Sequence, residues 1–440
     1  MPDDSYQPRP MAVPASRVSR LARFGGLASG VAGRAALQGL GQIARGARPE
    51  LRDLLLTPTN ARRLAEQLAQ MRGAAMKLGQ LMSMDTGELL PPEIAEIFAR
   101  LRAEAHYMPP KQLRQVLTAA WGADWHRRFA RFDVRPIAAA SIGQVHRALT
   151  KDGRDLAIKV QYPGVRRSID SDLRNVAALI RLAGVVPKEL DMGPLLEEAA
   201  RQLHDEADYV REGRALDRFG ALLKGTDGVR VPALHDDLTT PGVLAMDFAP
   251  GVAVETLDQA PQDLRDRIAR RLLALALREL FELGLMQTDP NFANYRYDPA
   301  TGDLILLDFG AARAVPETLA AAYRRLLRAG IRGDRDATRA AALEIGVFGP
   351  DTADRHQAQL MQMLELAFEP LRAGAVFDFA DRRLVTELRD RGMALAAARD
   401  FWHIPPADTL FVQRKLAGMY LLAARLGARV PTAPLLAPYL

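Results

Sequence analysis

The chain of 440 residues contains no cysteine, which excludes disulfide bonds and thiolate metal sites. Its 7 histidines show no paired spacing typical of metal ligands. No stretch is apolar enough to cross a membrane, because segments 268–286 and 410–426 are both interrupted by charged residues. Lysine is scarce as well: the 59 basic residues are 7 lysines and 52 arginines, so the ordinary surface cation is arginine.

Positive charge is concentrated near the start of the chain. Residues 1–63 contain ten arginines and four acidic residues, and this surplus equals the net charge of +6 of the whole chain. Since the remainder is balanced, we expect no nucleic-acid partner. Segment 21–34 is rich in Gly and Ala with flanking Arg, a composition that suits anionic lipid headgroups, whereas Arg34 ends the apolar run too early for a spanning helix. A flexible basic tail is the alternative.

The first residues, Met1-Pro2-Asp3-Asp4, lack the basic and apolar regions of a secretory signal. We therefore expect a cytoplasmic protein attached peripherally to the inner membrane. The preference for Arg over Lys favours a GC-rich bacterial genome.

Three oxygen-bearing side chains have the spacing of a protein-kinase-like site. Asn294 follows Asp289 by five residues, and Asp308, in an Asp-Phe-Gly tripeptide, follows Asn294 by fourteen. The first two lie in a turn-rich loop, and the apolar strand 304–307 precedes the third. Carboxylate and carboxamide oxygens suit a hard cation such as Mg2+ on ATP phosphates. The set matches a base and two metal ligands.

A candidate phosphate-covering hairpin and a lysine strand come earlier in the chain. Residues 138–145 fit the pattern G-x-G-x-x-G-x-V, with Ala138 and Ala140 at the first two glycine positions. Alanine restricts φ and adds methyl groups near phosphate, so we expect a stiffer loop. Lys159 lies on the apolar strand 156–160. A lone lysine there would usually be a surface residue, but its rarity and the Asp-Asn-Asp set favour a phosphate-binding role.

Lys77 lies in segment 58–84, whose apolar residues recur at helical spacing. Lys77 and Gln80 are three residues apart and share one helix face. Taken alone, this pair indicates a solvated helix face.

Together these motifs resemble the ABC1/ADCK/UbiB family of atypical kinase-like proteins, and within it the Coq8 branch linked to ubiquinone biosynthesis. The resemblance spans about residues 55–430. Its most specific parts are Lys77-Leu78-Gly79-Gln80, the family's KxGQ motif, and the alanine-rich loop 138–141. It is completed by Lys159, Glu206-Ala207-Asp208 (the ExD motif), the loop 287–294, which we call the catalytic loop, and Asp308-Phe309-Gly310.

The resemblance implies roles for individual residues. Asp289 would be the base, Asn294 and Asp308 would hold Mg2+, and Lys159 would contact ATP phosphate and pair with Glu212. By helical geometry alone, Asp208 could reach Lys159 equally well, because it lies four residues before Glu212.

The resemblance also implies regulatory and ATP-binding groups. Glu206 and Asp208 would lie near Lys77, and Lys77 with Gln80 would lie across the cleft where a peptide would otherwise enter. ATP would be held by Ala138, Ala139, Ala140 and Ser141, and its adenine by Met246, Asp247, Phe248 and Ala249.

Two departures from ordinary protein kinases bear on the substrate. The residues before Asp289 are Gln287-Thr288, so the usual preceding Arg is missing. The Asp-Phe-Gly tripeptide also runs almost directly into a helix predicted at Pro316-Glu317, without an Ala-Pro-Glu run. There is little room for a peptide platform, and we expect ATP hydrolysis or phosphotransfer to a small molecule.

The predicted fold class is α+β, a two-lobed protein-kinase-like fold with extra N-terminal helices and helical insertions in the small lobe. We expect a basic segment at 1–50 and a KxGQ helical extension at 51–110, with a second helix after Pro91-Pro92. A kinase-like N-lobe would follow at 111–246, with helices at about 165–184 and 194–220. A helical C-lobe would occupy 247–440.

Three functions remain open at this point. The first is an ATPase that uses Mg2+ and supports ubiquinone biosynthesis at the membrane, with anionic lipids and pathway lipids or enzymes as partners. The second is a true kinase acting on a lipid or protein. The third is a non-catalytic, nucleotide-binding pseudokinase scaffold. A homodimer is left open.

Overall fold

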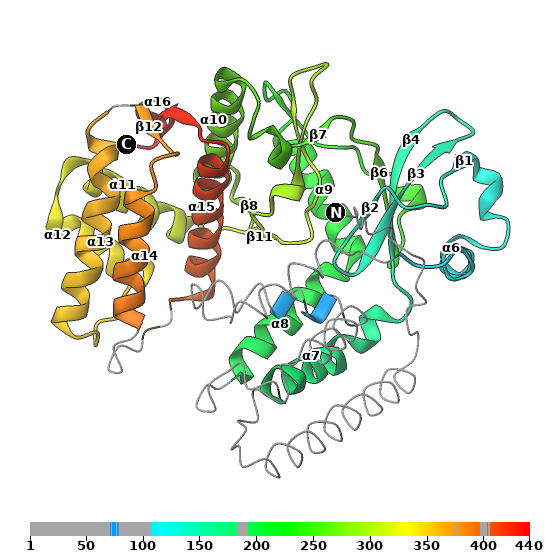
Figure 1. The fold of residues 1–440 in the computed structure, drawn as a ribbon, viewed down its shortest axis with the longest axis horizontal. Helices are drawn as coiled ribbons and strands as arrows, with labels where there is room; N and C mark the ends of the chain where they lie inside the picture. Colours follow the sequence, from blue (N-terminus) through cyan, green and yellow to red (C-terminus); the bar gives the residue numbers. More distant parts are fainter. Residues whose placement is uncertain are drawn as a thin grey trace, which may run out of the picture. The chain divides into compact units, whose positions relative to one another are not determined.

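The structure, a computed structural model, describes residues 71, 73–75, 77–78, 107–182, 192–374, 376–396, 403 and 405–440. These residues form two compact units (Figure 1). Unit 1 contains the described residues up to Gly213 together with Leu234–Phe248, and unit 2 contains Arg214–Ala233 and Ala249–Leu440. The basic segment 1–50, Gln80 and the helix predicted after Pro91 lie outside the described residues. Of segment 58–84, the short pieces 73–75 and 77–78 are described and are helical.

Unit 1 is built on an antiparallel sheet with the strand order β1-β3-β4-β6, and β2 pairs with β3. Strand alternation decides where Lys159 points: Leu156, Ile158 and Val160 pack with Leu113 and Leu117 of helix α6, so Lys159 faces the other side. The strands are β1 Phe129–Phe132, β2 Ala138–Ala139, β3 Gly143–Thr150, β4 Asp155–Gln161 and β6 Val243–Asp247, and α6 is Pro110–Trp121.

A second core in unit 1 joins three helices to the described residues around Lys77. Helix α7, Val165–Leu182, is present where a helix was predicted at about 165–184. The single helix predicted at about 194–220 is wrong, because the chain forms α8, Gly193–Glu206, and α9, Tyr209–Leu222. The Asp208 carboxylate accepts the backbone N–H of Arg211 at 3.1 Å and so starts a new helix instead of continuing the old one.

Unit 2 is mainly helical and contains short strands that carry the catalytic loop. Two small sheets have the orders β5-β10-β9-β7 and β11-β8, and β12 pairs with β13. The strands are β5 Val229–Arg230, β7 Val252–Ala253, β8 Leu285–Gln287, β9 Tyr295–Tyr297, β10 Leu304–Leu306, β11 Ala312–Ala314, β12 Val376–Asp378 and β13 Arg429–Pro431. The helices are α10 Gln262–Arg278, α11 Glu317–Arg332, α12 Arg335–Ile345, α13 Asp354–Arg372, α14 Arg383–Ala396, α15 Ala407–Arg425 and α16 Ala433–Leu436.

The α+β fold class is as predicted, with a sheet in unit 1 and a helical unit 2. The core of unit 2 is formed by apolar residues of α11, α12, α13 and α15 around Leu280 and Met286, which lie just before the catalytic loop. Within the described part of the chain, no helix combines the length and the apolarity needed to cross a membrane.

Candidate functional site

Lys159 is held by a buried ion pair within unit 1. Its Nζ lies 2.8 Å and 3.1 Å from the two carboxylate oxygens of Glu212, in the first turn of α9. The Glu212 side chain is 1% exposed, and the Lys159 ammonium also lies 5.1 Å from the centre of the Tyr209 ring. A carboxylate buried to this degree needs a counter-charge, so the pair fixes the direction of the lysine. Asp208, the alternative partner by helical geometry, caps α9 instead.

The alanine-rich loop is a tight hairpin between β2 and β3. Ala138 pairs with Val145 and Ala139 with Gln144, and Ala140 N–H donates to the Gly143 carbonyl at 2.9 Å. The side chains of Ala138 and Ala139 are exposed.

Gly143 is the only glycine of the loop pattern, and its surroundings require one. A Cβ there would lie 2.4 Å from the Val160 carbonyl oxygen and 3.0 Å from the Tyr209 hydroxyl. The backbone of β4 cannot move away without breaking its pairing with β3. This position is therefore fixed by packing, whereas the exposed positions 138 and 139 can carry alanine.

Glu206 connects the loop to the segment that carries Lys77. It accepts a hydrogen bond from Ser141 Oγ at 2.8 Å and forms an ion pair with Lys77, whose side chain is 4% exposed. Of the two acidic residues of the ExD motif, Glu206 contacts Lys77 and Asp208 shapes the backbone. Ser141 was expected to contact ATP, and its hydroxyl group donates to the Glu206 carboxylate.

Replacing Ala140 with glycine should change the affinity for nucleotide, because the loop backbone gains conformations that alanine forbids. The dissociation constants for ATP and ADP, measured by titration calorimetry, provide the test. Ala300→Gly, in an exposed turn of unit 2, is the matched control. Unchanged constants for Ala140→Gly would show that the loop's stiffness has no role in nucleotide binding.

The residues expected to hold adenine lie in or just after β6, the edge strand of the sheet, and contact neighbouring residues of unit 1. Met246 is buried in β6, and Asp247 Oδ1 lies 2.8 Å from His235 Nε2. The ring of Phe248 lies 4.0 Å from the Arg147 guanidinium, and its N–H donates to the Asp155 carbonyl. Ala249, the last residue of this run, belongs to unit 2, whereas the other three belong to unit 1. An adenine contact of this run stays a prediction.

In unit 2, Asp289 is held from two sides. Asn294 Nδ2 lies 3.2 Å from the Asp289 carbonyl oxygen and 3.4 Å from its Oδ2. The other carboxylate oxygen, Oδ1, lies 3.1 Å from Nη2 of Arg414 on α15. Asn291 Oδ1 accepts the N–H of Ala293, which starts the short helical turn that carries Asn294.

Asp308 and Asn294 are brought together through the backbone. Leu307 N–H donates to the Asn294 carbonyl at 3.0 Å, so the residue before Asp308 is tied to Asn294. Asp308 Oδ1 accepts Gly310 N–H at 3.0 Å, which fixes its rotation. Phe309 is 2% exposed and packs against Phe219, with ring centroids 5.1 Å apart. The Asp-Phe-Gly tripeptide is thus anchored at each residue.

The donor chemistry of Asn294 and Asp308 fits Mg2+, which prefers oxygen ligands and commonly takes one or two from the protein and the others from phosphates and water. With Nδ2 directed to Asp289, the amide oxygen of Asn294 is the atom suited to a cation. In the described parts of both units, no three His, Cys, Asp or Glu side chains form a metal-binding cluster.

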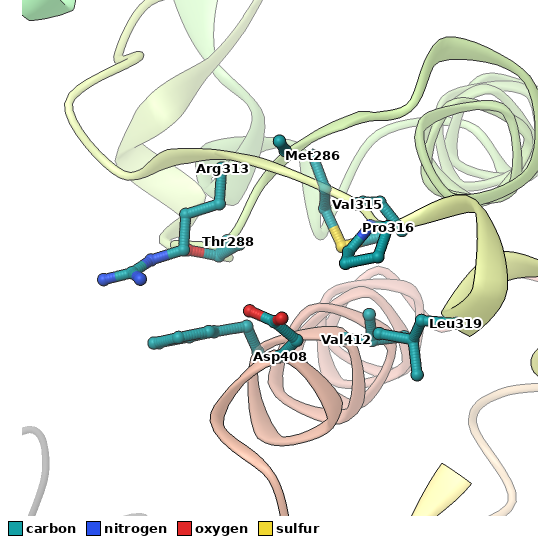
Figure 2. A pocket seen from close by; sticks show the side chains of 10 residues that line it. Met286, Thr288, Arg313, Val315, Pro316, Leu319, Asp408 and Val412 are labelled. Carbon is teal, nitrogen blue, oxygen red and sulfur yellow. The ribbon is translucent and has the colours of Figure 1, made fainter. Parts of the chain in front are cut away.

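The connection after Gly310 is as short as the sequence predicted. It forms β11, which pairs with β8, and then enters α11 at Glu317 with Pro316 at the N-cap. Figure 2 shows a hollow beside it, with the apolar side chains of Met286, Val315, Pro316, Leu319 and Val412 on one side and Thr288, Arg313 and Asp408 on the other. The Arg313 guanidinium lies 3.9 Å from the centre of the Phe411 ring, so α15 contacts β11 beside this hollow.

Sequence reasoning missed the residues of α15 that contact the catalytic loop and Tyr295 after it. Besides Arg414, these are Lys415, Gly418 and Arg425, whose guanidinium lies 5.4 Å from the centre of the Phe292 ring. Lys415 Nζ lies 2.9 Å from Glu279 Oε2 and 3.2 Å from the Tyr295 hydroxyl, and the side chains of Lys415 and Glu279 are each 1% exposed. Burial, the largest single effect, would lower the pKa of Lys415, but the charges of Glu279 and Tyr295 and the hydrogen bonds to them together raise this pKa. The scarcity of lysine, which pointed to Lys159, could have pointed to Lys415 too.

Comparisons with known proteins identify relatives of this chain. The model of the ABC1 atypical kinase-like domain matches residues 100–342. The chain is 37% identical over 428 residues to the atypical kinase COQ8, mitochondrial, of Saccharomyces cerevisiae, covering 96% of this chain and 85% of the yeast protein. It is 38% identical over 439 residues to the atypical kinase COQ8B, mitochondrial, of Rattus norvegicus, covering 98% and 81%.

A solved structure shares the fold. The complex of Rv3197 with erythromycin from Mycobacterium tuberculosis matches with a TM-score of 0.61 and 24% identity, over 87% of this chain and 96% of that one. The similarity to this structure concerns the fold alone, whereas the family match rests on the domain model and on the two relatives. The chain belongs to the ABC1 atypical kinase-like family.

Proposed function

We propose that this protein is a Mg2+-dependent ATPase that supports ubiquinone biosynthesis at a membrane surface. The observation that carries the proposal is the short connection after Gly310, which leaves little room for a docked peptide, in a chain that has kinase-type groups in each unit. Unit 1 contains the Lys159–Glu212 pair, and unit 2 contains Asp289, Asn294 and Asp308. From Gly310 the chain forms only β11 before α11, and Arg313 of that strand contacts Phe411 of α15.

Each group has a defined task in this proposal. Lys159, directed by Glu212, binds ATP phosphate as a point charge. Asp289 orients the attacking water and accepts its proton. Asn294 and Asp308 would hold Mg2+, which, when bound, neutralises charge on the phosphate oxygens.

The biological setting rests on the resemblance to the Coq8 branch and on the basic N-terminal segment. The relatives in yeast and rat are named as mitochondrial atypical kinases. The ten arginines among residues 1–63 give the chain an electrostatic attraction to anionic lipids, on the order of 1 kcal/mol for each residue near the surface.

The test is ADP release by purified protein, with Mg2+ or with EDTA, in the presence of anionic or zwitterionic liposomes. We expect turnover that requires Mg2+ and rises with anionic liposomes. A variant with Arg17, Arg20 and Arg23 replaced by glutamine should lose the lipid stimulation and keep the basal rate, because it changes the basic segment alone.

The other outcomes separate the alternative functions. Transfer of labelled phosphate to an isolated lipid or protein, lost in Asp289→Asn, would replace the ATPase by a true kinase. Nucleotide binding without turnover under every lipid condition would favour the pseudokinase scaffold.

A further inference from the structure

Arg414 lies beside the candidate base without a role in the sequence pattern. Its Nη2 is 3.1 Å from Asp289 Oδ1, and its side chain is 10% exposed while that of Asp289 is 22% exposed. Exposed ion pairs contribute about 0–1 kcal/mol, because water screens them. At this burial, water screens the pair less than it screens an exposed one.

The guanidinium of Arg414 has a donor that no described residue satisfies. Its Nε is buried and has no hydrogen-bond partner among the residues that the structure describes. A buried donor without a partner costs free energy, about 1–3 kcal/mol for neutral groups and more for charged ones. An ion pair with a purely structural role would not require a buried donor without a partner. A group that orders a reacting centre can retain such a donor despite its free-energy cost.

The helix that carries Arg414 rests directly on the catalytic loop. Gly418 lies one helical turn after Arg414, and a Cβ at Gly418 would lie 2.1 Å from Cβ and 2.2 Å from Cγ of Pro290. Lys415 contacts the Tyr295 hydroxyl at 3.2 Å, at the end of the loop. Helix α15 thus contacts the loop at Asp289 and Pro290 and the strand after it at Tyr295, and the absence of a side chain at Gly418 allows this close approach.

Ordinary protein kinases place an arginine immediately before the catalytic aspartate. Here that position is Thr288, whose hydroxyl donates to the Ala311 carbonyl at 2.8 Å. A cation is nevertheless present at Asp289, and it comes from a helix 125 residues later in the chain.

We propose that Arg414 is a positioning residue for Asp289, supplied by helix α15 near the end of the chain. Its guanidinium contacts one carboxylate oxygen of Asp289 and the Asn294 amide contacts the other, so that the rotation of the carboxylate is fixed. This inference rests on the proposed ATPase function, in which Asp289 orients water and accepts its proton.

The test compares kcat and KM for ATP in Arg414→Met, Arg414→Lys and Gly418→Ala. We expect Arg414→Met to lower kcat by about a hundredfold, as for a misplaced catalytic group, with KM changed less than about threefold. Arg414→Lys should recover about tenfold, because it keeps the charge and loses the planar fork. Gly418→Ala should also lower kcat, because it pushes α15 from Pro290.

Two matched controls should leave kcat unchanged. Arg328→Met removes an exposed arginine of α11, and Gly392→Ala adds a methyl group in α14 whose nearest neighbour is 3.7 Å away. A kcat within about twofold of wild type for Arg414→Met would overturn the inference. The inference would also be overturned if Arg414→Lys recovered none of the lost kcat, or if KM for ATP changed by the same factor as kcat.

Hydrogen exchange of residues 286–297 separates this inference from the proposed function. If the wild type itself shows no Mg2+-dependent turnover, the ATPase proposal fails. Faster exchange of this segment in Arg414→Met, with no change in Arg328→Met, would still support the positioning of the loop by Arg414. Equal exchange in both variants would overturn it.

Discussion

Replacing Lys415 with methionine should lower the free energy of unfolding of unit 2 by about 3–5 kcal/mol. The variant leaves the Glu279 carboxylate, whose side chain is 1% exposed, without its counter-charge at 2.9 Å. A buried charge without a partner is the costly state, more so than the loss of the attraction itself. The Tyr295 hydroxyl would lose its contact with Lys415 in the same variant.

Chemical denaturation followed by hydrogen exchange in peptides of α10 and α15 would measure this loss. The double variant Lys415→Met with Glu279→Gln should recover most of it, because no charge remains buried. Lys111→Met, on an exposed face of α6, is the matched control and should stay within about 0.5 kcal/mol of wild type. A loss below about 1 kcal/mol for Lys415→Met would show that the Glu279 charge is compensated in another way.

Replacing Asp308 with asparagine should lower Mg2+-dependent ATP turnover by about a hundredfold or more. Outer-shell changes at metal sites already cost about 10–100-fold, and this variant removes a proposed ligand charge. The fold should persist, because the asparagine Oδ1 can still accept Gly310 N–H, as the aspartate does at 3.0 Å. ADP release at saturating Mg2+ and the growth of a ubiquinone-deficient strain that carries the variant are the two measurements.

Asp336→Asn, in the exposed first turn of α12, gives the matched charge change away from the proposed site. It should turn over ATP at the wild-type rate. If Asp308→Asn complements the strain as well as wild type does, Asp308 has no catalytic role, and the ATPase proposal fails with it.

Local signals in the sequence were sufficient for several elements. The strand around Lys159, the strand before Asp308 and the helix that begins after Pro316 are all present, as β4, β10 and α11. Each has a short-range cause: an apolar β-branched run, or a proline at a helix start. The Lys159–Glu212 pair was expected from the family resemblance, since helical spacing alone allowed Asp208 equally well.

The break between α8 and α9 and the role of α15 could not be predicted in the same way. The apolar periodicity continues through Ala207, and the capping bond from Arg211 N–H to Asp208 that ends it is visible only in the fold. Arg414 and Lys415 were interpreted from sequence only as charges that interrupt an apolar stretch. Their partners, Asp289 and Glu279, lie more than a hundred residues earlier, so no local pattern joins them. The roles of the individual site residues in ATP binding and catalysis stay predictions.

The position of α15 late in the chain has a consequence for biosynthesis. Glu279 leaves the ribosome 136 residues before Lys415, which at ordinary rates of synthesis is on the order of 10 s. During this interval the nascent catalytic loop lacks the helix that holds it, and a collapsed intermediate would have to bury Glu279 without a counter-charge. The acidic residue therefore favours keeping this region open until α15 is made, so that the catalytic loop is not fixed in place in a partly synthesised chain.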